Sequence, residues 1–141
     1  MFFTRSDVFS AATSLYGVAD LRMLIQETHK FEAGYSFRLL GSSDLSDPVW
    51  EDRSPLFHID EITAPLLLLQ GAEDPPSQAH AMYDALVAKG NAVALKIYEG
   101  EGHGFRRATT IRDAWAAELA FYSRVWGLDV EVESDLVVTN L

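Results

Sequence analysis

Cysteine is absent from the sequence. Disulfide bonds, thiolate nucleophiles and cysteine-based zinc sites are therefore excluded, and a reducing cytoplasm is the expected setting. Metal-binding histidine spacings such as His-x-His or His-Glu-x-x-His are also missing, because the four histidines are scattered at His29, His58, His80 and His103. No phosphate-binding glycine loop opens a helix. We therefore expect neither a metal site nor a cofactor.

Basic residues and long apolar runs are scarce. Lys and Arg number 11 against 21 Asp and Glu, which gives a formal net charge of −10. An acidic surface without a basic cluster repels phosphate, so a nucleic-acid partner is excluded. The longest clear apolar run, Pro65–Leu69, is too short to cross a bilayer, and the amino terminus has no charged leader followed by an apolar core. We therefore expect no membrane contact and no signal peptide.

Apolar runs and helical periodicities alternate along the 141 residues, which is the length of one domain. Four consecutive leucines without polar alternation indicate a strand buried on both faces, as in a parallel sheet. Strand–helix–strand connections of this length are right-handed and give parallel pairing, so the fold class is α/β. The expected strands cover Val8–Tyr16, Ile62–Gln70 and Ala92–Tyr98.

Three helices and two irregular segments complete the expected order. Asp20 caps a first helix, Gln78–Lys89 forms a second that stops at Gly90, and the last ends at Gly127. The last helix is predicted to begin with the capping pattern Thr110-x-x-Asp113. Between the first helix and the leucine strand, Gly34–Pro55 is expected to be a surface excursion with a short helix, and the tail 129–141 is left unassigned. The predicted buried face of the last helix carries Ile111, Trp115, Leu119, Tyr122 and Trp126.

Two polar loops follow the ends of neighbouring strands. Asp74 comes directly after the leucine strand, and His103 lies in the glycine-rich loop after the next strand. Active sites of open parallel sheets lie beyond the carboxyl ends of the strands, so these side chains are expected to meet. A carboxylate on imidazole Nδ1 leaves the other nitrogen as a general base. The spacing also fits a plain alternative, in which Asp74 is a turn carboxylate and His103 an ordinary loop residue.

Several separated motifs resemble one known family. They are DVFSAATSLYGVADL, ETHKFE, SPLFHIDEITAPLLLLQGAEDPPSQAHAMYDALVAKG, KIYEGEGHGFRRA and AELAFYSRVWG, in this order. Together they resemble the carboxyl-terminal part of the catalytic domain of the prolyl oligopeptidase family, in its dipeptidyl-aminopeptidase and acylaminoacyl-peptidase branch. The resemblance covers roughly residues 5–129.

This resemblance implies a three-layer α/β-hydrolase fold, here partial, usually preceded by a β-propeller. Residues 1–128 would form the carboxyl-terminal portion of the catalytic domain, and 129–141 an acidic and apolar tail. The family cleaves short peptides with a serine, an aspartate and a histidine in that chain order. By motif, Asp74 resembles the acid and His103 the base of this triad.

Two features depart from the family pattern. The nucleophile motif Gly-x-Ser-x-Gly is absent, and in family order it would precede the strand at Val8, so Met1 would lie within or just after the nucleophile's helix. Asp74 also abuts Pro75-Pro76, where the family usually has a few more residues, so the fold must decide whether Asp74 still reaches His103.

Two hypotheses follow from these residues. In the first, the chain supplies the acid and base of a serine-type peptidase whose serine comes from an upstream half, and short peptides are the substrates. In the second, it is a non-catalytic remnant or an assembly module. Both hypotheses predict that the isolated chain is inactive, and that it self-associates through the exposed strand Val8–Tyr16.

Overall fold

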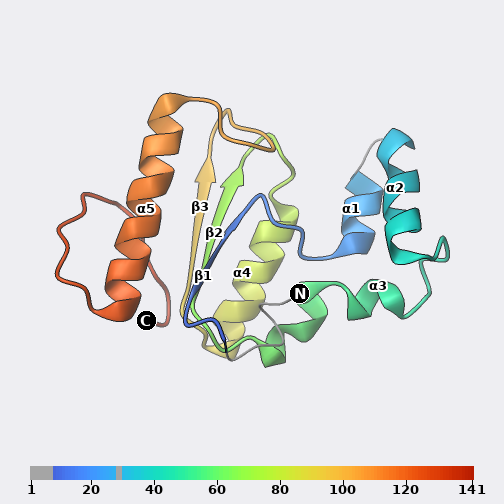
Figure 1. Cartoon of the computed structure of the whole chain (residues 1–141), viewed down its shortest axis with the longest axis horizontal. Helices are drawn as coiled ribbons and strands as arrows, with labels where there is room; N and C mark the ends of the chain where they lie inside the picture. Colours follow the sequence, from blue (N-terminus) through green and yellow to red (C-terminus); the bar gives the residue numbers. More distant parts are fainter. Residues whose placement is uncertain (1–7, 28–29) are drawn as a thin grey trace.

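The computed structural model describes residues 8–27 and 30–141. The expectation about Met1 and the nucleophile's helix concerns residues outside these ranges, and so does His29. Three parallel strands form a sheet of order β1-β2-β3, with one covering helix on each face (Figure 1). These elements are β1 (Ala12–Leu15), β2 (Leu66–Gly71), β3 (Val93–Tyr98), α4 (Ser77–Lys89) and α5 (Ala108–Trp126).

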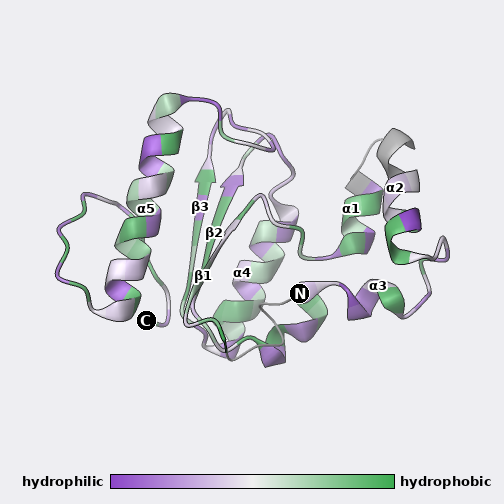
Figure 2. Ribbon diagram, viewed as in Figure 1, coloured by the Kyte–Doolittle hydropathy of each residue, from purple (hydrophilic) through white to green (hydrophobic). Residues whose placement is uncertain are grey.

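The four leucines of β2 form the centre of two cores. Successive side chains of a strand point to opposite faces. Leu66 and Leu68 pack with the core beneath α4, whereas Leu67 and Leu69 pack with the core beneath α5. All four are buried, and strands β2 and β3 are largely coloured as hydrophobic in Figure 2. The prediction of a parallel-sheet strand that is buried on both faces is confirmed.

Strand β1 is shorter than the predicted strand Val8–Tyr16. Its ladder with β2 begins at Ala12, whose N–H donates to Pro65 O at 3.0 Å, and ends where Tyr16 N donates to Leu69 O at 3.0 Å. Pro65 lies directly before β2, so the ladder between the two strands starts at this point. Within the described residues, β1 pairs on one side only.

The segment between β1 and β2 is more helical than the sequence indicated. Helix α2 continues through Gly34, where a Cβ would meet nothing within 4 Å, and ends before Gly41, whose φ is +74°. Of the two glycines, Gly41 and not Gly34 ends the helix, because Gly41 adopts a left-handed backbone. The helical elements here are α1 (Leu21–Glu27), α2 (Lys30–Leu40), α3 (Val49–Asp52) and the 3-10 helix η1 (Pro55–Glu61).

Helix α5 begins at Ala108, and the predicted capping pattern at Thr110 is wrong. The Thr110 hydroxyl is buried and donates to Glu101. The Asp113 carboxylate accepts a hydrogen bond of 2.8 Å from Tyr98 Oη. Both side chains are occupied by tertiary partners, and the helix starts without a side-chain cap.

The predicted buried face of α5 is also largely wrong. Trp115 is 66% exposed, and Leu119 and Trp126 are exposed as well. Small side chains beside Phe121 let the helix approach the sheet closely, and Trp115, Leu119 and Trp126 stay on the outer side. The residues that α5 buries are Thr110, Ala114, Ala117, Ala120, Phe121 and Ser123.

No helix within the described ranges is long and apolar enough to cross a membrane.

The tail 129–141 runs back along the outer edge of β3. Val93 and Thr139 exchange two backbone hydrogen bonds, of 3.0 and 2.8 Å, and the hydroxyls of Tyr83 and Thr139 are 2.9 Å apart. Leu136 is buried in the core beneath α5. The tail therefore pairs with the first residue of β3, Val93, at the outer edge of the sheet.

Candidate active site

The carboxyl ends of the three strands meet at one rim, and Asp74 and His103 are in contact there. His103 Nδ1 lies 3.0 Å from Asp74 Oδ2. An ionised carboxylate can only accept, so Nδ1 carries the proton. The Asp74 side chain is 26% exposed and the His103 side chain 70% exposed. The predicted contact is confirmed, although Asp74 abuts Pro75-Pro76.

The buried residue Gln70 holds the aspartate in place. Gln70 lies at the end of β2, and its Nε2 donates to Asp74 Oδ2 at 2.9 Å and to the backbone oxygen of Asp74 at 3.0 Å. The carboxylate oxygen that faces His103 therefore receives a second donor. Because Gln70 is anchored in the sheet, it fixes the acid relative to the strand ends.

Glu101 anchors the loop that carries His103. Its buried carboxylate accepts hydrogen bonds from Arg106 N (2.8 Å), Arg107 N (3.1 Å) and Arg107 Nε (3.0 Å). The donors, led by the Arg106 backbone N–H, lower the pKa of Glu101 from 4.5 to about 2, against the opposing effect of burial. Glu101 therefore stays ionised and closes the loop from 101 to 107.

The anchor predicts a specific dependence of stability on pH. A carboxyl whose folded pKa is depressed stabilises the fold fully above its unfolded value of 4.5, and loses that contribution as pH falls toward about 2. We expect the stability difference between wild type and Glu101→Gln to be largest above pH 4.5 and to shrink below it. Urea unfolding at a series of pH values measures this difference. Glu133→Gln, at an exposed position in the tail, is the matched control, and a pH-independent difference for Glu101→Gln would contradict the prediction.

The aspartate and histidine loops are also tied to each other directly. Glu73 N donates to the backbone oxygen of Glu101 at 2.9 Å. A Cβ on Gly71 would lie 2.3 Å from Glu101 O and 2.5 Å from Gly102 O, closer than any real Cβ contact. The end of β2 therefore passes against the histidine loop so closely that only glycine fits.

Tyr16, at the end of β1, is the third side chain of the rim. Its ring centroid lies 5.5 Å from that of His103 and 4.8 Å from that of Phe105. Its hydroxyl accepts a hydrogen bond of 3.0 Å from Phe105 N. All three strand ends therefore contribute to the surroundings of the imidazole.

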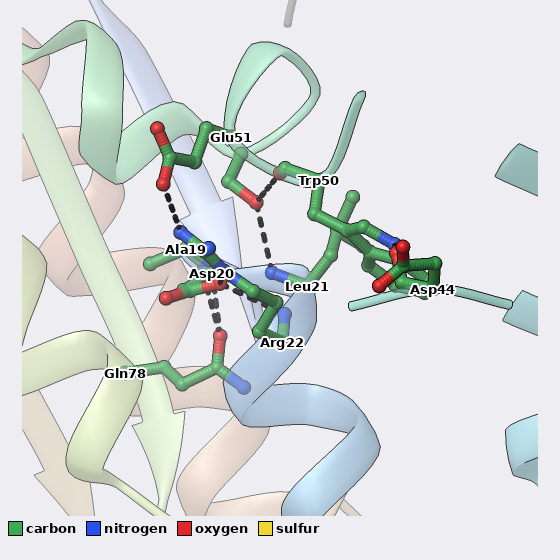
Figure 3. A network of polar contacts seen from close by, with 9 residues as sticks. Ala19, Asp20, Leu21, Arg22, Asp44, Trp50, Glu51 and Gln78 are labelled. Carbon is green, nitrogen blue, oxygen red and sulfur yellow. Dashed lines mark hydrogen bonds and ion pairs between the residues drawn. The ribbon is translucent and has the colours of Figure 1, made fainter. Parts of the chain in front are cut away.

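A polar network fixes the turn that follows Tyr16 (Figure 3). Gln78, a buried residue of α4, accepts the backbone N–H groups of Ala19 and Asp20 at 2.8 and 3.0 Å. Asp20 in turn accepts Arg22 N at 2.8 Å, which confirms the predicted cap of the first helix. Arg22 also pairs with Glu51 at 2.8 Å. The turn is thus bonded to both α4 and α3.

A small cavity adjoins the Asp74–His103 pair, with a volume of about 90 Å³. A larger pocket of about 280 Å³ lies on the α4 face of β1 and β2, and His103 does not line it. The two share Gly17, Val18, Gln70 and Gln78 as lining residues. The cavity at the pair therefore lies next to the larger pocket on the sheet face beside β1.

The structure removes Ser54 as a substitute nucleophile. Its side chain is fully buried, and its hydroxyl accepts Leu21 N at 3.0 Å while donating to Trp50 O at 2.6 Å. A hydroxyl bonded in this way is unavailable to a base at the strand rim. Ser77 is the first residue of α4.

Chemically, the rim presents an oriented imidazole. Nδ1 is bonded to Asp74, and Nε2 has no hydrogen-bond partner among the described residues. Such an imidazole can take a proton at Nε2 and be stabilised as the cation by the carboxylate. The site therefore has the parts of a general base, and no serine of the described residues is hydrogen-bonded to it.

Sequence reasoning did not single out Gln70, Glu101 or Tyr16. Each carried a weak signal: Gln70 is a polar residue that ends an apolar strand, Glu101 precedes the glycine before His103, and Tyr16 precedes Gly17 at a strand end. Their roles depend on partners in other segments, so spacing along the chain does not reveal them.

Comparison with known proteins identifies the family of this chain. A family model for the prolyl oligopeptidase family (Peptidase_S9) matches residues 1–129. Among solved structures, a puromycin-hydrolyzing peptidase of Mycobacterium tuberculosis is 42% identical, with a TM-score of 0.89, over 97% of this chain and 21% of that chain.

Two curated proteins are also similar. Dipeptidyl aminopeptidase BIII of Pseudoxanthomonas mexicana is 30% identical over 72% of this chain and 16% of its own length. Dipeptidyl peptidase family member 6 of Caenorhabditis elegans is 31% identical over 70% of this chain and 15% of its own length. The chain thus spans about a fifth or less of the length of each relative. It belongs to the prolyl oligopeptidase family of serine peptidases, and its three parallel strands with flanking helices are part of an α/β-hydrolase fold.

Proposed function

We propose that this chain supplies the acid and the base of a Ser-Asp-His triad, and that the nucleophilic serine comes from a segment outside these 141 residues. The observation that carries the proposal is the 3.0 Å contact between Asp74 Oδ2 and His103 Nδ1 at the strand rim. A turn carboxylate and a loop histidine without a catalytic role would have no reason to form this contact. The second donor from Gln70 and the anchored histidine loop support the same assignment.

The proposed reaction is hydrolysis of an amide bond. Asp74 holds His103 in the Nδ1–H tautomer, so Nε2 takes the proton of the serine as it attacks the carbonyl. The imidazolium then gives this proton to the leaving amine, which leaves an acyl group on the serine. Water attacks this acyl group with the help of the same base, and the carboxylic acid product is released. Asp74 remains ionised throughout and stabilises the imidazolium. The serine and its oxyanion donors are the parts that the upstream half would contribute.

The open edge of β1 is where that half would join. A parallel strand added beside β1 ends at the same rim, and a nucleophile elbow sits at such a strand-to-helix turn. The sheet face next to β1 is hollowed by the pocket of about 280 Å³. Both features are expected where a neighbouring strand and its helix are missing. We call the chain together with such an upstream half the completed enzyme.

Short peptides are the proposed substrates of the completed enzyme. Two relatives are named as dipeptidyl peptidases and one as a puromycin-hydrolyzing peptidase, so chromogenic dipeptides and puromycin are the first compounds to test. The proposal includes no nucleic acid, membrane, metal or cofactor. Its setting is a reducing cytoplasm, because a domain without cysteine folds without disulfides.

Labelling with a serine-reactive fluorophosphonate tests the proposal. We expect no labelling and no turnover by the isolated chain, because attack needs a serine beside the base and donors for the oxyanion. We expect labelling of the upstream half once the two are combined. A purified isolated chain that hydrolysed a chromogenic peptide, and lost this activity on His103→Ala, would show that a serine of this chain is the nucleophile.

The second candidate function is an assembly module, and the exposed edge of β1 favours it. Leu15 on β1 is 43% exposed, and Val8 and Phe9 just before the strand are exposed too. An unpaired, apolar strand edge pairs readily with another chain. Retained association together with no activity in the combined sample would favour this candidate over the peptidase.

We therefore expect the isolated chain to self-associate as its concentration rises. Leu15→Lys should shift the equilibrium toward the monomer, since lysine on an edge strand opposes edge-to-edge pairing. Analytical ultracentrifugation up to high micromolar concentration measures this, with Leu45→Lys, a similarly exposed leucine away from β1, as the control. A wild-type chain that stays monomeric over the whole range would count against the prediction.

A further inference from the structure

Tyr16 has an unusual backbone. Its φ is +53°, in the left-handed region that residues other than glycine seldom adopt. The residue is held there from both sides, because Tyr16 N forms the last β1–β2 hydrogen bond and the following turn is bonded to Gln78 of α4 (Figure 3). Strained backbone that the surrounding structure enforces is often found at functional sites. The strain therefore points to a role for the Tyr16 side chain.

The Tyr16 side chain contacts both residues that flank Gly104. Its hydroxyl accepts Phe105 N at 3.0 Å, and its ring lies 5.5 Å from the His103 ring at an angle of 54°. Its ring also meets the Phe105 ring edge-on at 4.8 Å, and Phe105 meets Tyr98 in the same way at 4.7 Å. Tyr16 therefore connects the histidine loop to the end of β1.

The histidine needs such a support. His103 lies between Gly102 and Gly104, and Gly104 has a φ of +110° that only a flexible residue adopts readily. Glu101 fixes the loop before the histidine and again at Arg106 and Arg107. Between these points the His103 side chain is 70% exposed, and its hydrogen bond to Asp74 competes with water.

We infer that Tyr16 is a positioning residue for His103. It acts through the Phe105 backbone N–H and through ring contact with the imidazole. The ring restricts the rotamers of His103, which keeps Nδ1 on Asp74 and leaves Nε2 for proton transfer. The catalytic meaning of this inference rests on the proposed function, whereas the restraint on the imidazole is a property of the isolated chain.

The test uses NMR on the full 141-residue chain with labelled histidine. Tyr16→Phe removes only the hydroxyl. Tyr16→Asn removes the ring and the hydroxyl, while asparagine tolerates the left-handed backbone. Tyr83→Phe is the matched control, since its hydroxyl bonds Thr139 in the tail instead of the histidine loop. Backbone resonances of β2 verify that each variant is folded.

Two signals are expected to change. Amide exchange at Phe105 should speed up about tenfold in Tyr16→Phe, because its acceptor is gone. In Tyr16→Asn, the Nδ1 proton signal of His103 should be lost to solvent exchange, and the nitrogen shifts should move toward the tautomer mixture of free histidine. Tyr83→Phe should change neither signal. In the completed enzyme, Tyr16→Phe should lower kcat roughly 10-fold with KM unchanged.

Clear outcomes overturn the inference. If folded Tyr16→Asn keeps the wild-type His103 signals, Tyr16 does not position the imidazole. If Tyr16→Asn does not fold, Tyr16→Phe decides, and unchanged Phe105 exchange then overturns the inference. Failure of the proposed function gives a different result, in which these NMR changes occur but His103→Ala leaves the activity of the completed enzyme intact.

Discussion

Replacing His103 by alanine in the completed enzyme is expected to lower kcat by roughly 10⁴- to 10⁶-fold. The imidazole is the base that takes the serine proton and the acid that protonates the leaving amine, so its loss removes both steps. His103 is largely exposed, and its described side-chain contacts are with Asp74 and Tyr16 at the rim and not in the core, so the variant should fold normally. Steady-state kinetics with a chromogenic dipeptide measures the loss.

Asp74→Asn should lower kcat by about 10⁴-fold. An amide in place of the carboxylate no longer enforces the Nδ1–H tautomer and no longer stabilises the imidazolium. His80→Ala, at an exposed position on α4, is the control and should keep full activity. Full activity of His103→Ala would remove the triad assignment, and full activity of Asp74→Asn would assign the acid to another residue.

Gly71→Ala is expected to destabilise the fold by roughly 2–3 kcal/mol. The new Cβ would lie 2.3 Å from Glu101 O and 2.5 Å from Gly102 O, and both are backbone atoms that cannot rotate away. The histidine loop must therefore move from the end of β2, which pulls His103 from Asp74. Urea unfolding measures the loss of stability, and loss of the His103 Nδ1 proton signal reports the separation.

Gly34→Ala is the matched control for this substitution. Gly34 is exposed within α2, and a Cβ there meets nothing within 4 Å. Alanine in a helix is favoured over glycine, so this variant should be more stable than wild type by up to ~1 kcal/mol. A Gly71→Ala chain as stable as wild type would mean that the two loops are not packed as closely as described.

The Asp74–His103 pair could be predicted because it follows from topology. Parallel strands bring their carboxyl ends to one rim, so two polar loops after neighbouring strands must meet there. The leucine run of β2 was equally informative, because four apolar residues in succession have no solvent-facing side. In both cases the deciding information is local in sequence.

The face of α5 could not be predicted in the same way. Trp115 and Leu119 have helical spacing and large apolar side chains, which favoured them as the buried face. Whether a large or a small residue faces the sheet depends on how closely the helix approaches, and the distance is set by the whole core. Here Ala114, Ala117 and Phe121 lie against the sheet, whereas Trp115 and Leu119 stay exposed.

The sequence by itself determined the α/β class, the order of the three strands, and the contact of Asp74 with His103 at the rim. Only the tertiary structure decided how those residues are held. Gln70, Glu101 and Tyr16 act through hydrogen bonds to other segments, and such partners are chosen by the fold. Periodicity and turn residues can be recognised from residues that are close together in the sequence. A hydrogen bond between two loops depends on the distance between them in space, and this distance is set only when the sheet has formed.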